Sequence, residues 1–254
     1  MILKKVREFL KANDWMDPNS IESDRKKGIP APDPYKSIPE DGKIIDLPSP
    51  KNLGQIPLIE TIVNRRSHRK YNTEELISLE ELSFLLYATQ GLAERKKKGS
   101  DTPIYGSRFR NVASGGNKHP FETYLVVYRV TGLTNGLYRY LPVGHKLLIV
   151  DEKEIPKEEV IQAYNGRKFI GDAAVVFIWS TIPYRTYHTY GSTTPKIIAQ
   201  DSGHLCQNLY LACTSIGLGM VAIGAYHQDR MDQLIKVDGT DEFVVYVAPV
   251  GKIP

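Results

Sequence analysis

Residues 65–71, with the sequence Arg-Arg-Ser-His-Arg-Lys-Tyr, place three arginines and a lysine around one serine. Arg65, Ser67 and Arg69 alternate along the chain, so in an extended backbone their side chains point to the same side. Two guanidinium groups and a hydroxyl suit the recognition of a phosphate dianion. A solvated charge run at the end of a helix explains the same residues, and this segment alone does not separate the two interpretations.

Three further segments carry glycine, amide or basic residues that contribute little to a hydrophobic core. In residues 113–120, small side chains let the backbone approach a flat ligand, and Asn117 can hydrogen-bond to amide-like edges. Residues 218–226 would expose backbone N–H groups where a strand turns into a loop. Lys252 ends the last predicted strand. Each of these segments also has a purely structural explanation. Residues 113–120 fit an ordinary turn, residues 218–226 fit a buried strand with spaced glycines, and Lys252 fits a surface lysine.

The usual signatures of nucleotide loops and hydrolytic sites are absent from the sequence. No Gly-x-Gly-x-x-Gly follows a predicted strand, no Gly-x-x-x-x-Gly-Lys-Ser/Thr occurs, and no serine lies in a Gly-x-Ser-x-Gly turn. No cysteine and histidine cluster has zinc spacing, so we expect no metal. Neither His119 nor His204 has an acidic partner at a recognisable spacing. This lack of catalytic side chains indicates that a bound cofactor carries the chemistry.

Hydrophobic periodicity indicates the helices and strands that would position these segments. A short helix from Pro57 to about Asn64 leads into the arginine segment. Ser78 and Glu81 form a capping box for a helix that ends near Gly91. The other expected helices cover about 156–164 and 196–216, and the expected strands are 123–130, 136–142, 145–150, 172–180 and 242–251.

The order of these elements predicts an α+β fold, because strands and helices mix without strict β-α-β alternation. Residues 14–57 are rich in Pro, Asp, Lys and Ser, which favours an extended arm over a packed element. We therefore expect residues 1–57 to form an N-terminal helix and arm, and residues 58–254 to form one domain. Loops at 92–110 and 183–195 are expected to supply substrate contacts.

Composition narrows the classes of function. The 254 residues are 41% hydrophobic and 24% charged, which is typical of a globular protein, and the net charge of +4 is too small to favour nucleic acid. No apolar run is long enough to cross a bilayer. The N-terminal segment has the pattern of an amphipathic helix without an apolar signal core, so we expect a cytoplasmic protein. Cys206 and Cys213 lie two helical turns apart and are expected to be buried thiols.

Taken together and in order, the segments resemble the FMN-dependent nitroreductase superfamily. The resemblance rests on the arginine-serine motif, the Ser-Gly-Gly-Asn loop before a strand, residues 203–226 and the Gly-Lys near residue 252. More narrowly, residues 65–147 resemble the SagB/ThcOx-type dehydrogenase branch, including the Gly-Leu-Tyr-x-Tyr hairpin and the histidine that follows it. The resemblance covers about residues 58–254.

This resemblance implies an α+β fold with a central mixed, mostly antiparallel sheet flanked by helices, and FMN at a homodimer interface. The flavin phosphate and ribityl chain would be held by Arg65, Arg66, Ser67, Arg69 and Lys252. Ser114 and Gly115 would reach FMN from the other subunit, with Asn117 in the same loop. The backbone N–H of Gly224 would face flavin N5, between Ile223 and Ala225. Arg167 is a candidate for the N1 side, or an ordinary surface arginine.

The resemblance further implies a two-electron oxidoreductase, with NAD(P)H as the electron donor and a nitroaromatic, quinone or activated alkene as the small-molecule acceptor. Two alternatives stay open: a SagB-like dehydrogenase of a peptide azoline or small heterocycle, and a non-catalytic protein that stores FMN. Ala113 stands where the family usually has proline. Azoline-oxidising members have a Lys-Tyr pair where this chain has Thr189-Tyr190. The missing lysine argues against azoline oxidation. Tyr190 is left as a possible proton donor or acceptor, or as a packing residue.

Overall fold

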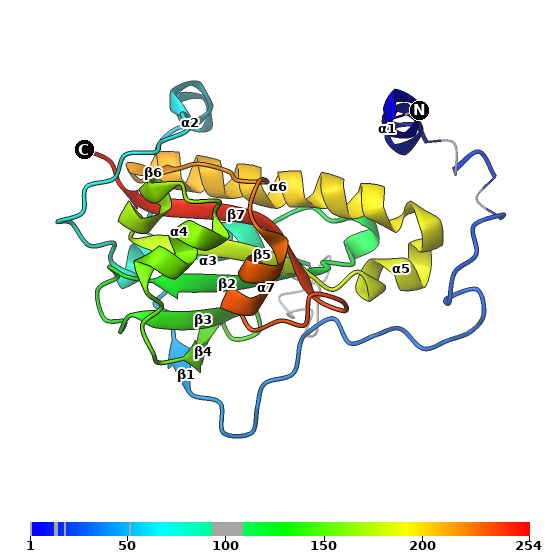
Figure 1. Cartoon of the computed structure of the whole chain (residues 1–254), viewed down its shortest axis with the longest axis horizontal. Helices are drawn as coiled ribbons and strands as arrows, with labels where there is room; N and C mark the ends of the chain where they lie inside the picture. The colour runs from blue at the N-terminus through cyan, green and yellow to red at the C-terminus, as the bar shows by residue number, and fades with distance from the viewer. Residues whose placement is uncertain (1, 13–14, 18, 51, 93–108) are drawn as a thin grey trace, which may run out of the picture.

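A computed structural model of the chain describes residues 2–12, 15–17, 19–50, 52–92 and 109–254. The strands in this part of the chain are β1 (Ile44–Asp46), β2 (Phe121–Val127), β3 (Gly136–Leu141), β4 (Lys146–Asp151), β5 (Val175–Thr181), β6 (Leu218–Met220) and β7 (Phe243–Lys252). They form one sheet with the order β1-β4-β3-β2-β5-β7-β6 (Figure 1). Within it every neighbouring pair of named strands is antiparallel.

Helices cover both faces of the sheet, as expected of an α+β fold. The helices α3 (Leu79–Gln90) and α6 (Thr194–Ser215) pack on one face, whereas α4 (Lys157–Ala163) and α7 (Gln228–Leu234) pack on the other. β5 lies in the interior of the sheet, between β2 and β7, and is buried along its whole length. Phe177 and Trp179 point into the first core, while Val176 and Ile178 point into the second. The apolar run therefore is a strand buried on both faces, which confirms the sequence prediction.

Local signals place the ends of several elements close to their predicted positions. The capping box at Ser78 is present: its Oγ accepts from the Glu81 N–H (3.1 Å), and the Glu81 carboxylate accepts from the Ser78 N–H (2.9 Å). The β3–β4 hairpin turns at Gly144, whose φ of 79° suits glycine. Cys206 and Cys213 are free and buried on α6, as expected.

Two short helices stand apart from the sheet (Figure 1). They are α1 (Ile2–Leu10) and α2 (Leu58–Asn64), and α2 contacts α6. Both expose large apolar side chains, at 50% for Phe9 and 66% for Leu58. No helix in the described ranges has both the length and the apolar character that crossing a bilayer requires.

The structure adds to one expectation about the extended segments and contradicts another. Within the arm, the short strand β1 pairs with β4 along the edge of the sheet. β1 has only three residues and lies in a Pro-rich stretch, so hydrophobic periodicity could not predict it. Residues 183–195 do not form a loop: α5 (Tyr184–Tyr190) is followed by a 3-10 turn, Gly191–Thr193. The α5 sequence has low helix propensity, so tertiary contacts must stabilise it. Of the expected loop 92–110, residues 93–108 lie outside the described residues.

Candidate functional site

The arginine segment runs from the end of α2 along β6. The Arg65 N–H still donates to Thr61 O of α2 (3.0 Å), and the His68 N–H donates to Met220 O of β6 (2.8 Å). Between these two anchors the backbone is neither helix nor strand. The segment is therefore tied to the sheet edge, next to residues 221–225 that follow β6.

Tyr210 of α6 joins the arginine segment to the turn after β6. The Arg65 guanidinium lies over the Tyr210 ring, 5.1 Å from its centroid. The Tyr210 hydroxyl is 2.8 Å from Ser67 Oγ, and it accepts a hydrogen bond from the Ala222 N–H (2.9 Å). One side chain thus holds together a guanidinium, a hydroxyl and a glycine-containing turn.

Gly224 presents an unused backbone donor at that turn. The preceding Ile223 is buried, and its N–H donates to Val247 O (2.8 Å). Gly224 and Ala225 are exposed, and within the described residues neither N–H makes a hydrogen bond. Apart from Gly224 itself and its two chain neighbours, no heavy atom of the described residues lies within 4 Å of the position that a Cβ on Gly224 would take. An acceptor atom of a planar ligand can therefore approach the Gly224 N–H.

The other predicted basic residues have different surroundings. Arg66 Nη1 donates to Val63 O (2.9 Å) and Arg65 O (2.8 Å), so this guanidinium binds carbonyls at the end of α2. Lys252 forms an ion pair with Glu81 of α3 (2.6 Å). Arg69 is exposed. Arg167 lies over the Tyr164 ring (5.4 Å), and its contacts are with that tyrosine.

The Ser-Gly-Gly-Asn loop forms a second cluster around Asp201 of α6. The Asp201 carboxylate accepts from Ser114 Oγ (2.7 Å) and from the Gly115 N–H (3.0 Å). Ser114 Oγ also accepts from the His119 N–H (2.9 Å). Burial raises the pKa of Asp201, and the bonds from Ser114 and Gly115 lower it in part. Ser114 and Gly115 are therefore engaged within their own chain.

Tyr190 belongs to this second cluster. A Cβ on Gly116 would lie 2.1 Å from the Tyr190 hydroxyl oxygen, which explains a glycine there with a φ of 55°. The Tyr190 ring also packs against Trp15 of the arm, at 5.8 Å between centroids. Along α6, Asp201 and Tyr210 are roughly 13 Å apart at 1.5 Å per residue. The predicted residues thus form two groups, one around Tyr210 and one around Asp201, and Arg167 belongs to neither.

Comparison with known proteins decides the family. The model of the nitroreductase family matches residues 62–252. This chain belongs to the nitroreductase family. A curated relative from Methanocaldococcus jannaschii, named as a nitroreductase, is 30% identical over 201 residues, which are 79% of this chain and 93% of the relative.

Solved structures of the nitroreductase family share the fold. A protein of Anabaena variabilis is 26% identical with a TM-score of 0.66, covering 85% of this chain. The match spans 42% of that protein, so this chain corresponds to less than half of it. A nitroreductase from Desulfovibrio desulfuricans, solved in complex with FMN, is 16% identical with a TM-score of 0.50, covering 78% of this chain and 86% of that one.

Within the nitroreductase fold, two organising residues escaped the sequence analysis. Half-buried Tyr210 and buried Asp201 lie on a long helix whose buried positions are mostly apolar, and a tyrosine or aspartate there is usually a packing or surface residue. No spacing in the sequence points to either residue. Their roles depend on which loops the fold brings to α6.

His119 gives this nitroreductase a stability that depends on pH. Burial, with a smaller contribution from Arg110, lowers the pKa of His119 to about 3. The folded state then binds fewer protons than the unfolded state below pH 6.5, so stability falls as pH falls from there toward 3. At about 1.36 kcal/mol per pH unit, we expect a loss of about 2 kcal/mol between pH 6.5 and 5 from this group.

Unfolding in urea at pH 7 and pH 5 measures this loss. His119→Gln should lose less stability than the unmodified protein over that range, whereas exposed His227→Gln should follow the unmodified protein. If His119→Gln loses as much unfolding free energy between pH 7 and pH 5 as the unmodified protein, His119 is not the source of the pH dependence.

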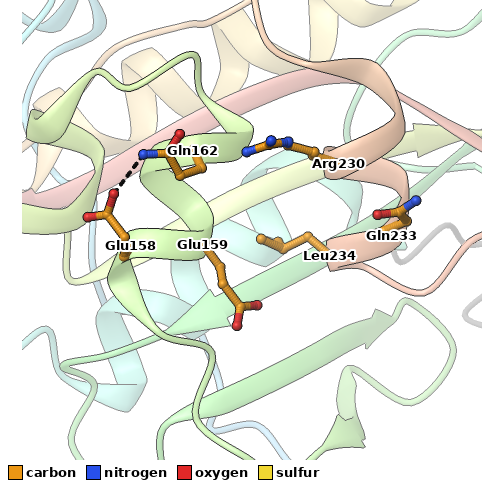
Figure 2. Close-up of a pocket in the computed structure, with 6 residues that line it drawn as sticks. All are labelled: Glu158, Glu159, Gln162, Arg230, Gln233 and Leu234. Atoms are coloured by element: carbon orange, nitrogen blue, oxygen red, sulfur yellow. Dashed lines mark hydrogen bonds between the residues drawn. The ribbon is translucent and has the colours of Figure 1, made fainter.

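A pocket of about 350 Å³ lies elsewhere, between α4 and α7 (Figure 2). Arg230 of α7 extends toward Gln162 of α4, and Glu159 points away from it. Glu158 accepts a hydrogen bond from Gln162 (2.7 Å). The charged side chains are exposed and of both signs, and none of the predicted site residues lines this pocket. It is therefore a surface groove separate from the Tyr210 cluster.

Proposed function

We propose that residues 58–254 form an FMN-binding domain with oxidoreductase activity, to which residues 1–57 add an arm. The observation that carries this proposal is the open Gly224 N–H beside the Arg65–Ser67–Tyr210 cluster. The FMN complex of the Desulfovibrio relative supports the choice of flavin. Bound FMN would supply two-electron, hydride-type chemistry through its N5 atom.

The chain's own residues would bind and orient the cofactor. Arg65 and Arg69, with the Ser67 hydroxyl, would hold the phosphate and ribityl chain. The Gly224 N–H would donate a hydrogen bond at N5, with Ile223 and Ala225 fixing that turn. Lys252 and Arg66 have partners of their own, so we assign them indirect roles: Lys252 anchors β7 to α3, and Arg66 fixes the end of α2. Arg167 would need to leave Tyr164 to serve the N1 side.

A homodimer is part of the proposal. The second cluster, with Ser114, Gly115 and Asn117, lies too far along α6 from Tyr210 for both to be assigned to one phosphate site. In a dimer, the second cluster of one subunit would instead face the first cluster of its partner. The apolar side chains that α2 exposes support an interface: they are Leu58, Ile59, Ile62 and Val63.

For the reaction we propose NAD(P)H as donor and a nitroaromatic, quinone or activated alkene as acceptor, binding in turn at the same site with ping-pong kinetics. Residues 65–147 also support the SagB-type alternative, in which an azoline or small heterocycle is oxidised. Tyr190 would then act as proton donor or acceptor. Its position against Gly116 and Trp15 makes a packing role the simpler assignment.

Anaerobic titration of the purified protein with NADH and then NADPH tests these proposals. Bleaching of the flavin absorbance bands establishes an NAD(P)H-dependent reductase. Bands that persist, but bleach with an azoline or heterocycle, establish the dehydrogenase. Bands that persist with every donor indicate FMN storage. A protein that takes up no FMN, even after reconstitution, contradicts the flavin proposal.

A further inference from the structure

A second pocket, of about 260 Å³, lies between the arm and the sheet. Figure 1 shows the arm passing along one side of the body to β1. Arm residues 36–39 form one wall of the pocket, strands β3 and β4 another, and the C-terminal end of α7 the third. No residue of the Tyr210 cluster or the Asp201 cluster lines it.

Arg139 of β3 lines this pocket, is buried, and forms no ion pair with any acidic side chain of the described residues. The whole residue is 2% exposed. Nη2 donates to the backbone carbonyls of Ser37 (2.6 Å) and Lys36 (3.5 Å). Nε is enclosed and makes no hydrogen bond, and Nη1 makes none to any described residue. A buried guanidinium that uses only one of its three nitrogens is costly unless something else accepts from it.

The neighbouring charges are already paired with one another. Lys36 forms an ion pair with Glu242, which also accepts from Tyr124 (3.0 Å). Lys236 forms an ion pair with Asp151 (2.5 Å). Of the three cationic residues that line the pocket, Lys36 and Lys236 are thus ion-paired, and Arg139 forms no ion pair with a described residue. One monoanion would balance it.

Besides Ser37, Tyr124 and the cationic residues, the pocket wall is apolar. Ile38 and Pro39 come from the arm, Leu148 and Val150 from β4, and Ile235 from the end of α7. A phosphate or sulfate would have to desolvate against these side chains, whereas a carboxylate with a hydrocarbon body matches both the guanidinium and the wall. The volume suits a molecule of fragment size.

We propose that this pocket binds a small organic monocarboxylate, with its carboxylate on Arg139 and its hydrocarbon body among Ile38, Val150 and Ile235. Since the Arg139 guanidinium also holds the carbonyls of Lys36 and Ser37, bound carboxylate stabilises the arm against the sheet. The site is independent of the flavin reaction and of the proposed function.

Calorimetric titration of the purified protein with hexanoate tests the proposal, with neutral hexanamide as the matched ligand. We expect hexanoate to bind with a dissociation constant of about 1 mM or tighter. Arg139→Gln should weaken this binding at least tenfold, because it removes a charge-assisted bond. Arg230→Gln, which changes the pocket between α4 and α7 instead, should leave it unchanged. Equal binding in Arg139→Gln, or equal binding of hexanamide, overturns the proposal.

Hydrogen exchange of arm residues 33–42 separates this site from hexanoate bound anywhere else. Hexanoate should slow exchange there in the unmodified protein and not in Arg139→Gln. Ile38→Trp is a second test for the case in which Arg139→Gln does not fold. Ile38 is 45% exposed, so the fold should tolerate a larger side chain there. The indole ring should occupy the pocket and block hexanoate while Arg139 is unchanged. If hexanoate still slows hydrogen exchange of residues 33–42 in the Ile38→Trp variant, the proposal is also overturned.

Discussion

The double substitution Arg65→Ala and Arg69→Ala is expected to yield folded protein that purifies without flavin colour. Each guanidinium would contribute a charge-assisted hydrogen bond to the phosphate, worth about 1.5–3 kcal/mol. Losing both should weaken FMN binding by a factor of about 10² to 10⁴. Neither side chain is buried in the core, so the fold should remain. The visible absorbance of the purified protein and an FMN titration measure the effect, and circular dichroism checks the fold.

Two single variants from the same segment serve as controls. Lys70→Ala removes an exposed charge that has no assigned role, so FMN binding should change little. Arg66→Ala should weaken binding less than either assigned arginine, because its guanidinium holds carbonyls of α2. A yellow double variant whose FMN affinity equals that of Lys70→Ala would refute the phosphate assignment.

The second large effect is expected from Glu122→Gln, which should destabilise the protein by about 3–5 kcal/mol. Glu122, at the start of β2, forms a buried ion pair with Arg185 of α5 (2.7 Å). A second buried guanidinium, Arg110, also interacts with it: burial lowers the pKa of Arg110, and the Glu122 charge opposes that shift. Removing the one charge leaves both guanidiniums uncompensated. Urea unfolding monitored by tryptophan fluorescence measures the loss.

A double-mutant cycle distinguishes this electrostatic cause from poor packing. Arg185→Met in the Glu122→Gln background removes one of the two stranded charges, so it should recover part of the lost stability. The same Arg185→Met in the unmodified protein should itself destabilise. If the effects of the two substitutions simply add, the ion pair is not the origin of the loss.

Much of the sheet could be predicted because its signals are local. The apolar run of β5, the hairpin at Gly144 and the capping box at Ser78 each lie within a few residues of sequence. β1 and α5 could not be predicted in the same way. β1 exists because β4 offers it an edge, and α5 is held by contacts such as the His188 bond to Ile29 O (2.7 Å).

The candidate site was likewise predictable only in part. Residue type and spacing singled out the arginine segment and the glycine turn, which the structure places on either side of Tyr210. Sequence gave no means of knowing that Lys252 would pair with Glu81, or that Ser114 and Gly115 would bind Asp201. Such partners come from distant parts of the chain, and only the fold brings them within hydrogen-bond distance.

The position of β7 in the sheet has a consequence for biosynthesis. β7 lies between β5 and β6, yet the ribosome makes it after α5, α6, β6 and α7. During translation one edge of the apolar strand β5 therefore stays unpaired until β7 has been made. This unpaired edge is a template for association with other nascent chains. Substitutions that weaken β7 are expected to reduce the yield of folded protein through aggregation, before they affect molecules that have already folded.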